Sequence, residues 1–208
     1  MLSAHKNYLS IFLILISSLY IDSEENPYLF IDSNAQKMVS VLTENSDLFN
    51  SDRESYENKI KEIFEPMIDF RRVAASVMGK KYYLLSTKAQ RNDFVEIFKD
   101  SLLDTYAETL AQWGDSTIST HFSDYLTDDK IKTIEVKQTL NTGSSQYPIS
   151  YKLRRSNDSW KIVNIIINGV NLGLTFRNQF QALAISNNED IESTLDNWVS
   201  DAGDAGIS

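Results

Sequence analysis

The stretch 69–87, DFRRVAASVMGKKYYLLST, is the most informative part of the chain. Apolar side chains recur along it with the spacing of one helix face, at Phe70, Val73, Ala74, Val77 and Met78. Such spacing predicts a short amphipathic helix. Gly79 follows the last apolar position, where helices commonly end on a residue with a left-handed backbone. We therefore expect the helix to end at Gly79.

Positive charges surround this apolar face, at Arg71, Arg72, Lys80 and Lys81. Tyr82 and Tyr83 add rings that have an apolar body and a polar tip. An apolar face with cations around it suits an anionic amphiphile, and it is equally typical of an ordinary surface helix. The remainder of the chain has to decide between these two interpretations.

The chain has 208 residues, of which 42% are hydrophobic, which is enough for one domain with a full core. Its beginning differs from the rest, because Lys6 precedes an apolar run over 9–21. This pattern is typical of a secretory signal peptide, whereas a membrane span needs about 20 apolar residues. We expect a signal peptide over 1–23, one domain over 24–200 and a flexible tail over 201–208. Retention of the first segment as a membrane anchor is the alternative.

The charge balance is acidic. Removal of residues 1–23 takes one basic and one acidic residue and leaves 19 and 28, a net charge of −9. A protein that binds nucleic acid needs a positive footprint, so this balance argues against nucleic acid as a partner. The chain has no cysteine. An exported chain without disulfides must take its stability from its core.

Helical patterns fill the first half of the chain. Asp32 or Ser33 is expected to cap a first helix, and Asp52 to open a second, which Pro66 ends. The polar segment 45–51 is expected to separate them. The apolar positions of the two helices are Ala35, Met38, Val39 and Leu42, then Tyr56, Ile60, Ile63 and Phe64.

The longest helical pattern begins at Ser86 or Thr87 and ends at Gly114. About 25 residues at about 1.5 Å each span about 38 Å, the width of a small domain. The apolar stripe of this helix is Phe94, Phe98, Leu102, Tyr106, Leu110 and Trp113.

After Gly114 the apolar period changes to two, the period of a strand. The alternating positions are Ile118, Thr120 and Phe122, then Ile134, Val136, Gln138 and Leu140, then Tyr147, Ile149, Tyr151 and Leu153. Residues 160–167, WKIVNIII, form a nearly continuous apolar run, as in a covered strand. Turn sequences over 127–129, 141–145 and 156–159 join these segments. They predict a four-stranded antiparallel meander with one buried face.

Helical spacing returns around Phe176 and Phe180 and again in a last helix capped by Asn187 or Asn188. The predicted fold class is α+β, with N-terminal helices, one long helix and C-terminal helices packed on one face of the meander. The sequence contains more apolar side chains than the covering of one sheet face requires. A sheet that curls around a long helix leaves an apolar pocket, the usual form of a ligand site. The alternative is that these side chains only fill a core.

Residue types that commonly act in catalysis or bind metal ions are scarce in this sequence. His121 is the only histidine after the apolar run over 9–21, and its position in the alternation predicts that it faces solvent. The chain has no HExxH, GxSxG or CxxC motif and no glycine-rich phosphate loop. The sequence indicates no catalytic residue and no metal site.

Three blocks carry a resemblance to a known family. They are FRRVAASVMGKKYY over 70–83, the long helix with Gln90-Arg91, Phe98 and Tyr106, and DSWKI followed by GVNLGLTFRNQF over 158–180. Together they resemble the MlaC family, the toluene-tolerance-type periplasmic phospholipid-binding proteins of Gram-negative bacteria. The resemblance covers about residues 34–198. Asn164 and Phe176 depart from the family pattern, which usually has Asp and often Tyr there.

The resemblance implies a soluble periplasmic carrier that is not an enzyme and that has phospholipid as cargo and no cofactor. Such proteins move glycerophospholipid between an outer-membrane lipoprotein–porin complex and an inner-membrane ABC transporter, which maintains outer-membrane lipid asymmetry. The acyl tails are expected to lie between sheet and helices, lined by Val73, Val77, Met78, Phe98, Leu102, Tyr106, Val136, Leu140, Ile149, Tyr151, Leu153, Ile165, Ile167 and Leu172. Head-group or partner contacts are expected from Arg71, Arg72, Lys80 and Lys81.

Two other functions stay open at this stage. A small cone-shaped α+β enzyme, such as an isomerase or dehydratase, needs a buried acid or base in the pocket. An adaptor that binds only protein needs no pocket. On the carrier hypothesis, Val77→Asp or Leu153→Arg is expected to remove bound phospholipid and leave the protein folded.

Overall fold

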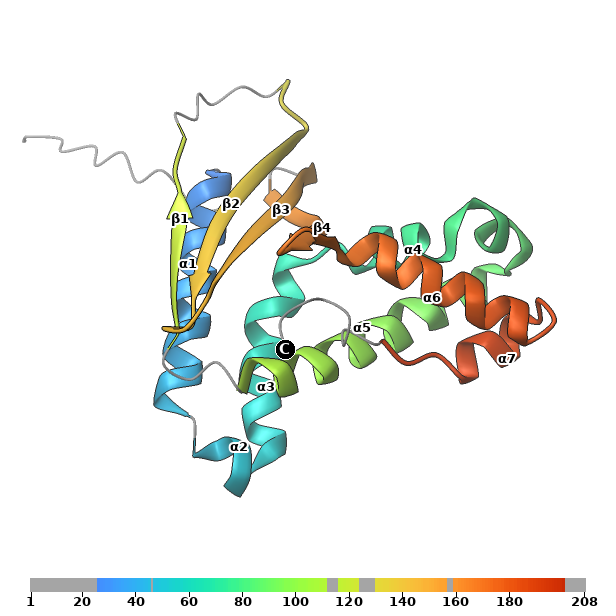
Figure 1. Ribbon diagram of the computed structural model, residues 1–208. Helices are drawn as coiled ribbons and strands as arrows, with labels where there is room; N and C mark the ends of the chain where they lie inside the picture. The colour runs from blue at the N-terminus through green and yellow to red at the C-terminus, as the bar shows by residue number, and fades with distance from the viewer. Residues whose placement is uncertain (1–25, 46, 112–115, 124–129, 157–158, 201–208) are drawn as a thin grey trace, which may run out of the picture.

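One antiparallel sheet forms one side of the molecule, with its five strands in sequential order (Figure 1). The strands are β1 (Thr117–His121), β2 (Thr133–Asn141), β3 (Gln146–Ser156), β4 (Ser159–Ile167) and β5 (Val170–Asn171). The α+β class and the meander are confirmed. The expected count of four strands is one too low, because β5 folds back onto β4.

The missed strand β5 had a local sequence signal. Asn168 and Gly169 both have positive φ, of 49° and 84°. Two successive residues with positive φ characterise the two-residue hairpin turn for which Asn-Gly is a preferred sequence. The turn pairs Ile167 with Val170.

The computed structural model describes residues 26–45, 47–111, 116–123, 130–156 and 159–200. The predicted signal peptide, the tail over 201–208 and the end of the long helix lie outside these ranges. The helices are α1 (Pro27–Glu44), α2 (Leu48–Ser51), α3 (Arg53–Phe64), the 3-10 turn η1 (Glu65–Met67), α4 (Phe70–Leu85), α5 (Lys88–Ala111), α6 (Leu172–Ser186) and α7 (Ile191–Asp196). Among the helices so described, none is long and apolar enough to cross a membrane.

The helices form two groups around the sheet (Figure 1). Helix α1 lies along the sheet, while α4 and α6 extend away from it above α5, with α7 at their far end. The outward face of the sheet is polar: Glu135 and Lys152, for example, are exposed and directly opposite each other in neighbouring strands. His121 is exposed as predicted, and its Nε2 lies 2.8 Å from Thr139 Oγ1.

A bulge explains the continuous apolar run of β4. Asn164 pairs with Lys152 and Ile162 pairs with Leu153, so Val163 is an extra residue without a partner on β3. An extra residue reverses the inward and outward alternation along a strand. Ile162 therefore shares the inner face with Leu153 before the bulge. After it, Ile165 and Ile167 share that face with their partners on β3, Tyr151 and Ile149.

Two predicted helix starts are wrong, because other side chains cap the helices. Helix α1 begins at Pro27, and the Asn26 side chain accepts hydrogen bonds from the amides of Tyr28 and Leu29 at 2.9 and 3.2 Å. Asp32 and Ser33 therefore lie inside this helix. The earlier start adds a buried turn, with Tyr28, Phe30 and Ile31 in the core.

The last helix, α7, is capped by Asp190, three residues after the first of the two predicted caps. Asn187 ends α6, and Asn188 and Glu189 then turn the chain with positive φ. The carboxylate of Asp190 caps α7 by accepting from the Ser193 amide at 2.7 Å. This backbone hydrogen bond lowers the pKa of Asp190. By contrast, the predicted start of α5 is confirmed: Thr87 and Gln90 exchange hydrogen bonds between amide and side chain.

Helix α4 is interrupted at Gly79, where the sequence predicted its end; the φ of 69° and ψ of 168° of this residue are not helical. The chain resumes a helical turn afterwards, so Tyr82 and Tyr83 lie in a second helical segment rather than in a loop. Two arginines hold the two segments. Arg177 donates to the Ser76 carbonyl at 2.7 Å, and Arg91 donates to the Ser86 carbonyl at 2.7 Å.

Replacing Gly79 with alanine is expected to lower the free energy of unfolding by about 1–3 kcal/mol, because this backbone region is essentially restricted to glycine. A Cβ at this position would lie 3.5 Å from Gln181 Nε2, an ordinary contact, so the cost is expected to come from the backbone. Urea denaturation of Gly79→Ala measures it. An unchanged midpoint would contradict the observed conformation.

Candidate functional site

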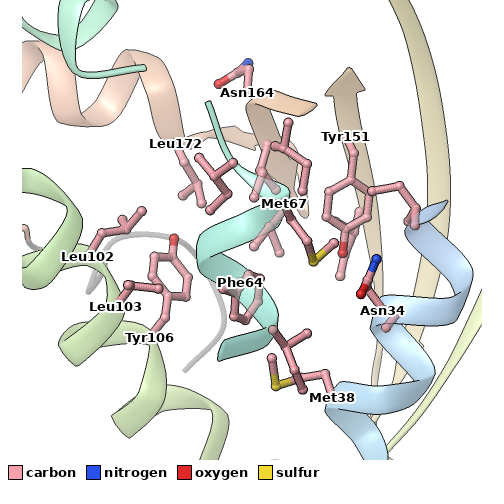
Figure 2. Close-up of a pocket in the computed structure, with 18 of the residues that line it drawn as sticks. Asn34, Met38, Phe64, Met67, Leu102, Leu103, Tyr106, Tyr151, Asn164 and Leu172 are labelled. Atoms are coloured by element: carbon pink, nitrogen blue, oxygen red, sulfur yellow. The ribbon is translucent and has the colours of Figure 1, made fainter. Parts of the chain in front are cut away.

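A cavity of about 140 Å³ lies between the sheet and the helices. Its wall combines α1, the end of α3 with η1, one side of α5, the start of α6 and the inner face of the sheet (Figure 2). These elements are far apart in sequence, and the long helix α5 and the meander face each other across the space. The curled sheet and the long helix thus enclose the apolar pocket that the sequence indicated.

The cavity wall is almost wholly apolar. The described residues that line it are Ile31, Asn34, Ala35, Met38, Val39, Leu42, Ile63, Phe64, Met67, Ile68, Val73, Phe98, Leu102, Leu103, Tyr106, Ser116, Ile118, Leu140, Ile149, Tyr151, Ile162, Asn164, Ile165, Ile167, Leu172, Gly173 and Phe176. None of these is Asp, Glu, His, Lys or Arg. The wall that they form therefore offers burial of apolar surface as its main interaction.

Most of the residues expected to contact acyl tails do lie on this wall. Ten of the fourteen line the cavity: Val73, Phe98, Leu102, Tyr106, Leu140, Ile149, Tyr151, Ile165, Ile167 and Leu172. They come from α4, α5, α6 and three strands, which the fold brings to one space. Lipid contact by these residues stays a prediction.

The other four expected residues lie in the closed core. Val77 and Met78 pack among the α4, α5 and α6 side chains, and Val136 and Leu153 pack around Trp160. None of the four lines the cavity. Val77 and Leu153 are 0% exposed, so a charge there is expected to unfold the protein. The variants Val77→Asp and Leu153→Arg are therefore unsuitable tests of the pocket.

Helix α1 and the end of α3 supply much of the wall, and their residues were not among those predicted to contact lipid. The apolar stripes at Ala35, Met38 and Val39 and at Ile63 and Phe64 were visible as helix faces. Their spacing shows which residues are buried together, but it carries no information on which faces meet across a cavity.

Besides Ser116, four polar side chains stand on this apolar wall (Figure 2). Asn34 donates to the Phe30 carbonyl at 2.8 Å, and Asn164 accepts from the Gly173 amide at 3.1 Å. Tyr106 on α5 and Tyr151 on β3 project into the cavity from opposite walls. Burial raises the pKa of both phenols, so both stay neutral.

The cations expected at the head group or at a partner all lie outside the cavity wall. Arg71 and Lys80 are exposed. Arg72 pairs with Asp69 at 3.1 Å, and Lys81 of α4 pairs with Glu189 in the turn between α6 and α7. Exposed pairs of this kind contribute little stability, about 0–1 kcal/mol. All four cations are accessible from solvent.

Metal ligation has no support in the part of the chain that the structure describes, where no group of three His, Cys, Asp or Glu side chains gathers.

Comparison with known proteins gives consistent matches. A family model described as MlaC protein matches residues 32–200. The toluene tolerance protein ttg2D of Pseudomonas putida is 28% identical over 181 residues, covering 87% of this chain and 83% of that protein. The intermembrane phospholipid transport system binding protein MlaC of Haemophilus influenzae is 22% identical over 187 residues, covering 89% and 78%.

The fold is similar to that of a solved structure. It is the phospholipid-binding protein from Ralstonia solanacearum in complex with a phospholipid, with a TM-score of 0.70 and 22% sequence identity. The match covers 80% of this chain and 90% of the other.

Proposed function

The chain belongs to the MlaC protein family, and on that premise we propose that it is a carrier of glycerophospholipid that holds acyl chains in the cavity between sheet and helices. The observation that carries the proposal is the apolar wall, whose described residues include no ionisable group other than tyrosine. The names of the relatives support it, since one is a transport-system binding protein for phospholipid. A protein-only adaptor would not need such a cavity.

The energy of burial is sufficient for this role. Each methylene transferred from water to an apolar site contributes about 0.8 kcal/mol. Two acyl chains therefore offer tens of methylenes to offset extraction from a bilayer. The head group needs few contacts, and its phosphate stays near solvent.

Lipid binding requires the cavity to widen. A volume of about 140 Å³ is close to that of an engineered cavity that holds one benzene ring, about 150 Å³, and it is below the roughly 300–1,000 Å³ of sites for drug-sized ligands. We expect the sheet with α1 and the helices α5 and α6 to separate when acyl chains enter. The wall atoms then lose contacts with one another and gain contacts with the acyl chains.

The proposal also covers the compartment in which the carrier works and the complexes that it contacts. The carrier works in the periplasm after removal of residues 1–23, as one domain over 24–200. It receives and delivers lipid at an outer-membrane lipoprotein–porin complex and an inner-membrane ABC transporter, which maintains outer-membrane lipid asymmetry. The accessible cations Arg71, Arg72, Lys80 and Lys81 contact the lipid phosphate or these partners. Family membership supports these statements.

Transfer between vesicles tests the carrier function. Donor vesicles that contain self-quenched fluorescent phospholipid are mixed with unlabelled acceptor vesicles, and fluorescence is followed as lipid arrives in the acceptors. We expect the rate to rise in proportion to protein concentration. A rate equal to spontaneous exchange at all protein concentrations would overturn the proposal.

A further inference from the structure

Two tyrosine hydroxyls face the cavity without a partner among the described residues (Figure 2). The Tyr106 hydroxyl is buried, and no described residue forms a hydrogen bond with it. No described residue is hydrogen-bonded to the Tyr151 hydroxyl either; this residue is half-buried, and its hydroxyl is not among the fully buried unpaired groups. The two rings reach the cavity from α5 and from β3, so the unpaired groups come from opposite walls.

An unpaired buried hydroxyl is costly. Leaving such a group without a partner costs about 1–3 kcal/mol, and folded proteins leave few of them. Because burial raises the pKa of both phenols, each keeps its proton and is a hydrogen-bond donor at physiological pH. The two phenols thus present two donors to whatever enters the cavity.

The chemistry of the wall restricts which group of a lipid can accept hydrogen bonds from these two phenols. Hydrocarbon chains contain no acceptor. A phosphate is an anion, and the described wall has no Lys or Arg to compensate its burial. An ester carbonyl is neutral, accepts hydrogen bonds, and lies between the tails and the head of an acylglycerol. It is the lipid group that fits a neutral donor within an apolar wall.

We propose that Tyr106 and Tyr151 form an ester-binding subsite, in which their hydroxyls donate to the carbonyl oxygens of the acyl esters of a bound glycerophospholipid. The subsite fixes the depth of the lipid, with the glycerol between the two rings, the chains beyond them and the phosphate on the solvent side. This inference rests on the proposed carrier function and adds a preference for ester-linked over ether-linked chains.

The test compares two phosphatidylethanolamines with identical chain lengths, one with two acyl esters and one with two alkyl ethers. The purified protein is incubated with vesicles that contain equal amounts of both, and the two lipids retained by the protein are quantified by mass spectrometry. We expect wild-type protein to favour the ester lipid by about 5-fold for each hydrogen bond. Tyr106→Phe and Tyr151→Phe are each expected to reduce this ratio several-fold.

Tyr56 provides a matched control. Its hydroxyl is also buried and without a partner among the described residues, but it lies outside the cavity wall. Tyr56→Phe removes the same chemical group and is expected to leave the ester-to-ether ratio unchanged. Circular dichroism of all three variants, measured alongside, identifies any variant that is unfolded, and the remaining cavity variant then decides.

The outcomes separate the two proposals. Retention of both lipids in equal amounts by wild type, with no change in the Phe variants, overturns the ester-binding subsite and leaves the carrier function in place. Retention of neither lipid overturns the carrier function and the subsite with it. An ester preference that is lost equally in Tyr56→Phe also overturns the subsite, because the effect is then not specific to the cavity.

Discussion

Phenylalanine in place of Ala35 is expected to weaken phospholipid binding by about 100-fold while the protein stays folded. Ala35 lines the cavity from α1, and its side chain is small. A phenyl ring there occupies a space of benzene size, which matches the cavity volume of about 140 Å³. The lipid then loses room for roughly three or four methylenes at about 0.8 kcal/mol each. Equilibrium binding of a fluorescent phospholipid measures the change.

Ala89→Phe is the matched control for this substitution. Ala89 is exposed on α5 and does not line the cavity. The same ring at that position is expected to leave lipid affinity within about twofold, as surface changes usually have small effects. If Ala35→Phe bound lipid as tightly as wild type, the cavity would not be the place where the chains lie.

Alanine in place of Phe94 is expected to lower the free energy of unfolding by about 3–5 kcal/mol, the usual cost of removing a buried aromatic ring. Phe94 is 0% exposed, and its ring contacts those of Phe98, Phe180 and Trp198 at centroid distances of 5.8, 4.9 and 5.5 Å. This cluster joins α5, α6 and the segment after α7. Single domains are stable by about 5–15 kcal/mol, so the loss is a large fraction.

Phe94→Leu tests whether the loss of stability in Phe94→Ala comes from lost packing. Leucine keeps much of the volume and is expected to cost less than about 1.5 kcal/mol. Urea denaturation measures both variants. Because Phe94 does not line the cavity, the folded fraction of Phe94→Ala is expected to bind lipid normally. A loss below about 1 kcal/mol for Phe94→Ala would contradict the packed ring cluster.

Local patterns predicted much of the fold. The change of apolar period after Gly114 separated helices from strands, and Thr87 with Gln90 marked the start of α5. Predicted helix starts were wrong where more than one polar residue could cap the helix. Asn26 with Pro27 caps α1 in place of Asp32 or Ser33, and the start of α7 was likewise misplaced.

The bulge at Val163 is a different kind of limit. An apolar run such as WKIVNIII hides the reversal of alternation, because both of its faces look apolar. Only pairing with β3 fixes which residues face inward. The sequence therefore predicted a covered strand, but it could not place the extra residue within that strand.

The sequence predicted that the site is built from apolar residues, but it predicted less well which of these residues face the cavity. Val77 and Leu102 are both apolar helix positions, but Leu102 faces the cavity and Val77 lies in closed packing. This difference depends on how helix axes cross, which spacing does not encode. The unpaired hydroxyl of Tyr106 likewise becomes visible only when the surrounding elements are in place.

The most direct test of the carrier function is native mass spectrometry of the protein purified from cells, with identification of extracted lipid. We expect a species heavier than the bare chain by the mass of a phospholipid, which organic extraction releases and fragmentation identifies. A protein that shows only the bare mass, with no phospholipid in the extract, would contradict the carrier function.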